Sequence, residues 1–278
     1  MSDWEISEKT VLITGSTDGI GKQTAVELSK LGAKVIIHGK SQEKIEKTVK
    51  ELSKYGNVRA YRVDFSSLKE IKEIAVKILE NEEKLDVLIN NAGIFSNQKI
   101  FSEDGYELTF AVNHLAPFYL TLLLIPLLKK SAPSRIVNVS SMAHSASIDF
   151  KNLQGERGYN GYEAYSLSKL ANILFTFELA EKLKDSDITV NCLHPGVINT
   201  KLLREGWGFG GASVTEGAKT SVYLASSPEV SEITGKYFSN RRVSEPARIL
   251  YDGSIRKKLW HISEKLIKDR GFEIPKIN

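Results

Sequence analysis

Residues 10–21 read TVLITGSTDGIG, an apolar run rich in β-branched residues that passes directly into a glycine-rich turn. The run has the composition of a strand, and the turn opens a segment of helical period. Here Gly15 can make the tight turn, Gly19 lets backbone approach a phosphate, and Gly21 permits close packing of helix on strand. Exposed N–H groups at the start of the helix favour an anion. The stretch therefore indicates a strand–turn–helix unit that binds a dinucleotide.

The spacing of these glycines is not the usual one. Three residues separate Gly15 from Gly19, so the order is G-x-x-x-G-x-G rather than G-x-G-x-x-G. Taken alone, the glycines could also form a plain tight turn with no ligand. The position of the turn inside the first strand–helix unit is what favours the dinucleotide.

The same alternation repeats along the chain. Short apolar runs such as KVIIH, DVLIN, RIVNVS and ITVNCLH are separated by longer segments of helical period. Strands that are apolar nearly throughout, joined by helix-length connections, require a parallel sheet covered on both faces. We therefore predict an α/β fold, a Rossmann-type doubly wound parallel sheet of about seven strands with helices on both faces.

No Pro/Ser-rich spacer, repeat or low-complexity tract interrupts this pattern, so residues 1–278 are predicted to form a single dinucleotide-binding domain. Stretches at about 142–161 and 197–214 are predicted to be substrate-loop insertions, because loops over the sheet edge carry specificity. Trp207 and Phe209, set among glycines, indicate either an apolar lid or a flexible surface loop. Residues 254–270 are predicted to form a C-terminal helical tail.

Composition excludes several classes of function. Of the 278 residues, 41% are hydrophobic, which suffices for a substantial core, and the net charge of +4 is spread along the chain. Nucleic acid is therefore not a predicted partner, and no metal site is predicted. Cys192, the only cysteine, is interpreted as a buried filler. Because neither a leader pattern nor about 18 uninterrupted apolar residues is found, we predict no transmembrane segment and a cytoplasmic location. Peripheral membrane contact is left open.

The end of the second predicted strand bears on the coenzyme. An acidic side chain there accepts from the ribose 2′-OH of NAD, whereas a basic one accommodates the 2′-phosphate of NADP. The sequence reads IIHGKSQEK, with Gly39 at the strand tip and Lys40 after it. NADP(H) is therefore favoured over NAD(H), the alternative being that Lys40 is an ordinary solvated lysine. Asp64, closing the third predicted strand, either caps the next helix or accepts from an adenine amino group.

Three tyrosines, Tyr159, Tyr162 and Tyr165, crowd the stretch GYNGYEAYSLSK. A phenol with a pKa of about 10 becomes a useful proton donor and acceptor when a nearby cation stabilises its phenolate. On a helix that cation must lie three or four residues away. Of the three, only Tyr165 has a lysine, Lys169, at this distance. An ordinary helical Tyr/Lys pair is the alternative, unless other polar groups accompany it.

Such groups end other predicted strands. Ser140 and Ser141 follow the strand RIVNV at the edge where ligands bind, and a hydroxyl there can either donate to a substrate carbonyl oxygen or cap a turn. The stretch DVLINNAG ends at the same edge and supplies amides and small residues near a cofactor. Asn113, among apolar residues in FAVNHLAPFYL, is either a satisfied core amide or part of a water relay.

Together these motifs resemble the short-chain dehydrogenase/reductase family. The likeness runs from about Lys9 to Phe238 and comprises, in the family's order, TGSTDGIG, Asp64, NNAG, Asn113, VSS, YSLSK and HPGVINT. A finer resemblance, in SSMAH, AYSLSKLANILF and CLHPGV, is to the retinol-dehydrogenase-like branch. It informs the class of substrate only loosely.

The resemblance implies a role for each matched residue. Tyr165 would be the general acid/base, and Lys169 would lower its pKa and bind the nicotinamide ribose. Ser141 would orient the carbonyl, with Ser140 as the alternate, and Asn113 would hold a water of the proton relay. The implied cofactor contacts are Gly15, Ser16, Gly19, Ile20, Gly21, Lys40, Asp64, Asn91, Ala92, Gly93, Tyr165, Lys169 and Thr200. Lys40 stands where this branch carries arginine, which keeps the charge but loses the guanidinium fork.

The predicted activity is NADP(H)-dependent interconversion of an aldehyde or ketone, of lipophilic or aromatic character, and its alcohol. The predicted partner is this small-molecule substrate, and the resemblance also implies a homodimer or homotetramer. The competing function is a non-enzymatic NADP(H)-binding module that reports redox state to a partner protein. The intact set of Tyr165, Lys169 and Ser141 argues against it, because a sensor needs no proton donor.

Overall fold

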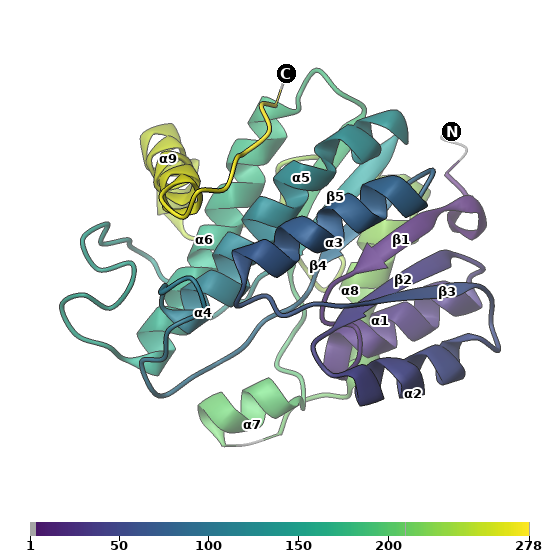
Figure 1. Cartoon of the computed structure of the whole chain (residues 1–278), viewed down its shortest axis with the longest axis horizontal. Helices are drawn as coiled ribbons and strands as arrows, with labels where there is room; N and C mark the ends of the chain where they lie inside the picture. The colour runs from purple at the N-terminus through teal and green to yellow at the C-terminus, as the bar shows by residue number, and fades with distance from the viewer. Residues whose placement is uncertain (1–3, 209, 278) are drawn as a thin grey trace.

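Eight strands form one sheet, in the order β3-β2-β1-β4-β5-β6-β7-β8, in the computed structural model, which describes residues 4–208 and 210–277 (Figure 1). The strands are β1 (Thr10–Ile13), β2 (Lys34–Gly39), β3 (Val58–Arg62), β4 (Val87–Asn90), β5 (Ser134–Val139), β6 (Ile188–His194), β7 (Tyr237–Ser239) and β8 (Arg242–Ser244). Strands β1 to β7 pair in parallel, and β8 returns antiparallel to β7. The predicted doubly wound α/β sheet is confirmed, with one short antiparallel strand added.

Helices fill the connections between the strands. The α-helices are α1 (Gly19–Lys30), α2 (Gln42–Leu52), α3 (Leu68–Asn81), α4 (Leu108–Phe110), α5 (Ala116–Lys130), α6 (Gly161–Lys182), α7 (Lys201–Trp207), α8 (Val214–Ser226) and α9 (Gly253–Lys268). A π-helical turn, η2 (Ala111–Leu115), joins α4 to α5, and the 3-10 turns are η1 (Ile6–Glu8), η3 (Pro228–Val230) and η4 (Arg248–Tyr251). Helices α2, α3 and α8 begin after Ser41, Ser67 and Ser213, whose hydroxyls accept first-turn N–H groups.

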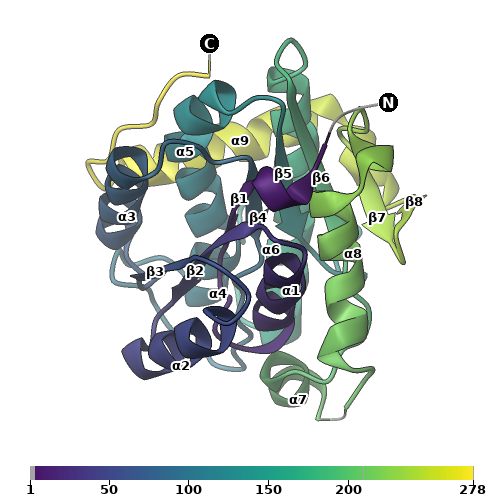
Figure 2. The ribbon, with the colours of Figure 1, turned by 90° about the vertical axis from the view of Figure 1, so that its right-hand side faces the viewer.

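The sheet separates two apolar cores, because successive strand residues face opposite sides. In β1, Val11 and Ile13 belong to the core shared with α1, α2 and α8, whereas Leu12 belongs to the core shared with α3, α5 and α6. Figures 1 and 2 show these two groups of helices on the two faces of the sheet, with α9 packed outside α6. Both faces are therefore covered, as a parallel sheet requires.

The order of the strands locates the binding crevice. β1 lies between β2 and β4, so the connections that follow β1 and β4 lead away from each other on opposite halves of the sheet. In open α/β sheets, ligands bind beyond the carboxyl ends of the strands at this reversal. The glycine turn follows β1 and the NNAG stretch follows β4, so the fold brings both motifs to this crevice.

The expectation that no segment could span a membrane is wrong by length and composition. Among the described residues, one continuous helical segment, Leu108–Lys130, is long and apolar enough to do so. The segment has no run of 18 uninterrupted apolar residues, but uncharged polar residues such as Asn113 and Thr121 do not end the helix. In the fold, 89% of the most apolar 18-residue part of this segment is buried, as is usual for a helix in the core of a globular protein.

The predicted loops and tail can also be located. Residues 142–160 contain no helix or strand, and α7 occupies part of the stretch 197–214. The tail predicted at 254–270 corresponds to α9, which packs against α6. Phe209, interpreted with Trp207 as a lid, lies outside the described residues. The assignment of the whole chain to one domain stays a prediction.

Candidate active site

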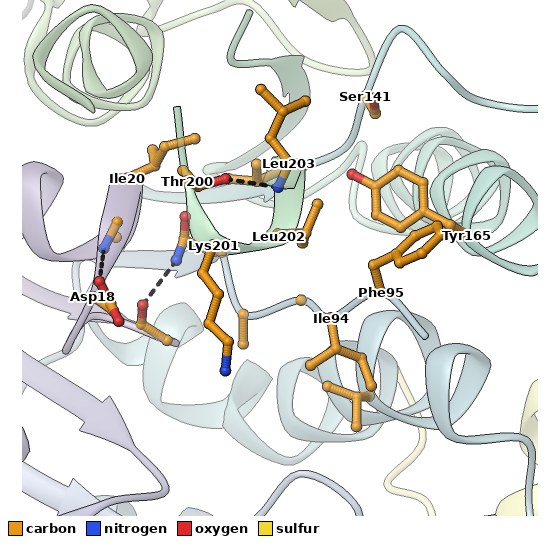
Figure 3. A pocket seen from close by; sticks show the side chains of 18 of the residues that line it. Asp18, Ile20, Ile94, Phe95, Ser141, Tyr165, Thr200, Lys201, Leu202 and Leu203 are labelled. Atoms are coloured by element: carbon orange, nitrogen blue, oxygen red, sulfur yellow. Dashed lines mark hydrogen bonds between the residues drawn. The ribbon is translucent and has the colours of Figure 1, made fainter. Parts of the chain in front are cut away.

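A pocket with a volume of about 960 Å³ lies over the carboxyl ends of the central strands (Figure 3). Its walls come from the glycine turn after β1, the tip of β2, the segments after β3, β4, β5 and β6, and helices α6 and α7. Most of the residues that the sequence singled out therefore meet in one place. The pocket-lining members are Gly15, Gly19, Ile20, Gly21, Lys40, Asp64, Asn91, Ala92, Gly93, Ser140, Ser141, Tyr165, Lys169, Thr200 and Trp207.

Two of the glycines cannot be replaced without displacing backbone. Gly15 has a φ of +62°, and a Cβ there would lie 2.8 Å from the Cα of Ala92. A Cβ at Gly21 would overlap both the backbone carbonyl oxygen of Gly15 and Nδ2 of Asn91. The side-chain amide of Asn91, in the NNAG stretch, also stabilises the glycine turn, because it donates to the Thr14 carbonyl at 2.9 Å. The turn therefore carries no side chain at these two positions. Its backbone N–H groups lie at the start of α1, where a phosphate would bind.

Ser16 is the predicted cofactor contact that does not line the pocket. Its side chain is fully buried, where its hydroxyl donates to the Ile13 carbonyl at 2.7 Å and accepts from the His38 N–H at 2.9 Å. The turn directs this side chain into the protein, so it ties β1 to β2 instead of facing a ligand. A linear motif does not show which way each side chain of a turn points.

An ion pair lies at the end of the pocket near β2 and β3. Lys40 Nζ is 2.5 Å from Asp64 Oδ2, and the Lys40 side chain remains 74% exposed. Burial opposes ionisation of Asp64, but hydrogen bonds from Lys40 and from the Ser66 N–H outweigh it and hold the pKa below its usual value. The carboxylate is therefore charged at neutral pH, and Lys40 offers a cation with its ammonium largely in solvent.

The catalytic candidates on α6 are one helical turn apart. The helix begins after Asn160, whose side chain accepts from the Glu163 N–H at 3.1 Å. Tyr165 and Lys169 both lie on its buried face, and Lys169 Nζ is 5.5 Å from the centre of the Tyr165 ring. The ammonium also donates to the Val139 carbonyl at the end of β5, at 3.1 Å. This contact fixes the lysine between its own helix and the sheet.

The other two tyrosines of the cluster point elsewhere. The Tyr159 hydroxyl donates to the Ser96 carbonyl at 2.9 Å and so anchors a loop. Tyr162 is 50% exposed, with its ring edge against Trp207. Of the three, Tyr165 is the one that lines the pocket, as the spacing to lysine predicted.

The geometry also separates the two serines. The Ser140 hydroxyl is buried and donates to the backbone carbonyl of Lys169 at 2.7 Å, so it is occupied in holding α6 to the sheet. The Ser141 side chain lies close enough to the phenol of Tyr165 to lower its pKa. Figure 3 shows Ser141 and the hydroxyl end of Tyr165 on the same side of the pocket. Ser141 is therefore the serine placed to act with the tyrosine.

The pKa of the phenol differs from the sequence-based expectation. Burial raises the pKa of Tyr165 to about 12, and the neighbouring Ser141 side chain opposes this only in part. Burial also lowers the pKa of Lys169 to about 8. The expected lowering of the tyrosine pKa by the lysine is not found, because loss of hydration dominates at both groups. Tyr165 is consequently a neutral proton donor at pH 7, beside a lysine that is mostly charged.

Asn113 lies in the π-helical turn η2 and is completely buried. Its Oδ1 accepts from the Ile94 N–H at 2.8 Å, and its Nδ2 donates to the Ser168 hydroxyl at 3.0 Å. It is thus a satisfied core amide. A Cβ placed on Gly93 would be 3.4 Å from both Asn113 Oδ1 and Lys169 Nζ, so both groups lie beside the same glycine. The water relay through Asn113 stays a prediction.

Motif reasoning missed Phe95, which forms an aromatic wall beside the tyrosine together with Trp207, a residue that the sequence offered as part of a lid. The ring of Trp207, on α7, lies 5.5 Å from the ring of Tyr165 and 5.5 Å from the ring of Phe95. Phe95 lies two residues after the NNAG stretch, and this position near a cofactor-binding motif is the one feature of the sequence that could have pointed to it. Further pocket-lining residues that the sequence did not assign are Thr17, His38, Ile94, Met142, His194, Leu202 and Leu203.

Thr200 has a structural contact in addition to its place in the pocket wall. Its hydroxyl accepts from the Leu203 N–H at 3.2 Å and so caps α7. A Cβ on Gly19 would lie 3.5 Å from its methyl group, so α7 starts directly against the glycine turn. The helix that carries Trp207 is thereby joined to the dinucleotide end of the pocket.

A sheet of this order, a glycine turn at its reversal, and a buried Tyr/Lys pair beside a serine define an oxidoreductase that uses a nicotinamide dinucleotide. A model of the short chain dehydrogenase family matches residues 9–207. The chain belongs to that family and is an NAD(P)-dependent short-chain dehydrogenase/reductase. Family membership and the assembled pocket favour this enzyme class over the non-enzymatic sensor.

Named relatives and solved structures agree. The chain is 43% identical to human retinol dehydrogenase 14, over 93% of this chain and 86% of the relative, and 43% identical to human retinol dehydrogenase 13, over 98% and 87%. A crystal structure of a putative uncharacterized protein from Mycobacterium paratuberculosis has a TM-score of 0.82 and 32% identity, covering 99% of this chain and 98% of that one. The RhlG/NADP active-site complex from Pseudomonas aeruginosa has a TM-score of 0.71 and 27% identity, covering 86% and 97%.

Proposed function

We propose that the protein interconverts a lipophilic or aromatic aldehyde or ketone and its alcohol with NADP(H), using Tyr165 as general acid/base. The observation that carries this proposal is the meeting of Tyr165, Lys169 and Ser141 in one pocket with the glycine turn. When bound, the nicotinamide supplies or accepts the hydride. The chain supplies the binding site, the orientation of the carbonyl and the proton.

The pocket suits a dinucleotide. Gly15 and Gly21 leave the turn without side chains, and the start of α1 offers N–H groups to a pyrophosphate. Asp64, Lys169 and Thr200 all line the pocket. The resemblance to the family implies that Asp64 meets the adenosine, Lys169 the nicotinamide ribose and Thr200 the carboxamide.

The preference for NADP(H) rests on Lys40. No carboxylate ends β2, because the tip residue is Gly39, and the exposed ammonium of Lys40 can reach a 2′-phosphate. The RhlG structure, at 27% identity, carries NADP, which supports the same coenzyme here.

The proton chemistry follows from the charges in the pocket. In the reducing direction, the neutral phenol of Tyr165 donates its proton to the carbonyl oxygen as that oxygen gains negative charge. The hydroxyl of Ser141 donates a hydrogen bond to the same oxygen. The ammonium of Lys169 then stabilises the phenolate that remains. In the oxidising direction the phenolate takes the alcohol proton.

The lining indicates the class of substrate. Phe95 and Trp207 present apolar surface beside Tyr165, and Leu202 and Met142 line the same pocket. Burial of a long apolar or aromatic substrate against them contributes roughly 25 cal/mol per Å² of apolar area removed from water. The relatives named retinol dehydrogenases support a lipophilic alcohol or aldehyde.

A paired assay tests the proposal. NADPH and NADH consumption would be followed with aliphatic, aromatic, steroid, retinoid and quinone carbonyls. We expect turnover with NADPH to exceed that with NADH, and kcat/KM to rise with the apolar area of the carbonyl compound. A preference for NADH would contradict the role of Lys40, and equal kcat/KM for small polar and large apolar carbonyls would contradict the substrate class.

A further inference from the structure

The peptide group that links Ser141 to Met142 is held on both of its polar atoms by histidine side chains. His144 contacts the Ser141 carbonyl through Nδ1, at 2.7 Å. The Met142 N–H donates to Nδ1 of His194, at 3.1 Å. The two histidines come from the SSMAH and CLHPGV stretches, to which neither the fold nor the proposed proton chemistry assigns a role.

The partners fix the tautomer of each ring. A carbonyl oxygen only accepts, so Nδ1 of His144 carries a proton and donates it. Its other nitrogen, Nε2, accepts from the Ala247 N–H at 3.2 Å. His194 has the opposite tautomer, because its Nδ1 accepts from an N–H. Burial lowers the pKa of His194 to about 4, with the nearby His144 as a further cause, so Nδ1 remains free to accept at neutral pH.

This peptide needs such support because of where it lies. Strand β5 ends at Val139, so Ser141 is beyond the last residue held by the sheet ladder. The Ser141 hydroxyl accepts from the Ala143 N–H at 3.0 Å, which occupies an acceptor site of its oxygen and leaves its own proton to donate. With the peptide plane fixed on both sides, the direction of that hydroxyl depends on the side-chain torsion alone.

We propose that His144 and His194 are positioning residues that together hold the Ser141–Met142 peptide and thereby aim the Ser141 hydroxyl at the substrate oxygen. The inference rests on the proposed function, in which Ser141 donates to that oxygen. The orientation of Ser141 then also depends on the segment after β8, since the Ala247 N–H binds Nε2 of His144. Neither histidine needs to touch the substrate to affect the rate.

Asparagine and glutamine variants distinguish the hydrogen bond made by Nδ1 of a histidine from the one made by Nε2. The amide of asparagine ends at the same distance from the backbone as Nδ1, whereas that of glutamine reaches the position of Nε2. His194→Ala should lower kcat about tenfold, since small misplacements of a reacting group have effects of this size or larger. His194→Asn, which can accept from Met142, should recover most of this loss. The Kd for NADPH should stay within about twofold in both variants.

The same pair of substitutions at His144 tests whether the contact to Ser141 or the contact to Ala247 matters. His144→Asn can still donate to the Ser141 carbonyl but cannot reach Ala247. His144→Gln can reach Ala247 but not Ser141. We expect the asparagine variant to keep the higher kcat. A higher kcat for the glutamine variant would show an anchor for the C-terminal segment only and would overturn the proposal.

A double-mutant cycle completes the test. Ser141→Ala alone should lower kcat by about 100-fold or more, as for loss of an oxyanion donor. In that background, His194→Ala and His144→Ala should lower kcat by less than about twofold, because they act through the missing hydroxyl. Equal effects in both backgrounds would overturn the inference. Full activity of Ser141→Ala itself would instead refute the role of Ser141 in the proposed function. Thermal unfolding of each variant confirms that folded protein is compared.

Discussion

At the residue scale, the spacing argument selected the tyrosine that lines the pocket but did not predict its electrostatics. A cation four residues along a helix identified Tyr165, and the structure places that side chain in the pocket. The sequence could not show how completely the pair is buried, and burial is what raises the pKa of Tyr165 and lowers that of Lys169. The sequence also left Ser140 and Ser141 unresolved, because the choice depends on which hydroxyl faces α6.

Replacing the buried lysine should stabilise the protein while stopping the reaction. The pKa of Lys169 falls from 10.5 to about 8 on burial. Between those values the unfolded chain binds the proton and the folded one does not, so stability rises with pH. At pH 7 the cost of burying the ammonium is fully present. Lys169→Met should therefore raise the free energy of unfolding at pH 7 by about 1–3 kcal/mol.

Urea unfolding across pH checks this. The difference between Lys169→Met and the parent should shrink as the pH rises from about 8 toward 10.5, because the parent loses its buried charge. Turnover of the variant should be lost at every pH. A variant that is less stable than the parent at pH 7 would show that the contact with the Val139 carbonyl outweighs the cost of burial.

The coenzyme preference should depend on Lys40. Lys40→Ala removes the exposed ammonium at the tip of β2, and a charge-assisted hydrogen bond to a phosphate is worth about 1.5–3 kcal/mol. We expect the Kd for NADPH to rise at least about tenfold and that for NADH to change little. Lys47→Ala, an exposed lysine of α2 paired with Glu43, is the control. A parallel loss of affinity for both coenzymes would contradict contact with the 2′-phosphate.

At the element scale, the long periodic segments were predicted and the short or irregular ones were not. The buried parallel strands and their helices follow from apolar runs alternating with helical period. The three-residue strand β8 was missed because its residues are partly or fully exposed and give no apolar signal. The π-helical turn η2 could not be predicted either, since a change of helical hydrogen bonding leaves the apolar pattern intact.

A buried polar network ties the catalytic helix to the sheet. Asn90 Nδ2 on β4 donates to Asn138 Oδ1 on β5 at 2.8 Å, and Asn138 Nδ2 donates to the Thr176 hydroxyl on α6 at 2.9 Å. Asn138→Ala removes one hydrogen bond from each partner and leaves a cavity, although Asn90 keeps its bond to Thr121 and Thr176 keeps its bond to Asn172. It should lower the free energy of unfolding by about 1–3 kcal/mol.

Chemical denaturation measures this change. Asn81→Ala removes an exposed amide on α3 that bonds only within its helix, and it should change stability by less than about 0.5 kcal/mol. If the two alanine variants were equally stable, the network would not be what holds α6 against β4 and β5.

At the scale of the whole molecule, the strand order explains why distant motifs form one site. The reversal between β1 and β4 opens the crevice, and the carboxyl ends of the parallel strands bring the glycine turn, the NNAG stretch and the serine to its rim. The tyrosine and lysine reach the same crevice from α6. The family resemblance implied this meeting of residues, whereas the aromatic wall depends on where α7 folds back. The predicted cytoplasmic location stays a prediction.

The central claim is that the Tyr165 hydroxyl supplies the proton for reduction beside a bound nicotinamide dinucleotide. Tyr165→Phe removes one oxygen atom, and Tyr162→Phe, half-exposed on the same helix, is the matched control. The decisive measurement is NADPH oxidation with a lipophilic aldehyde, alongside direct titration of NADPH binding. We predict that Tyr165→Phe binds NADPH within about twofold of the parent while its kcat falls by at least about 100-fold, and that the control keeps its kcat. Unchanged turnover in Tyr165→Phe would contradict the account.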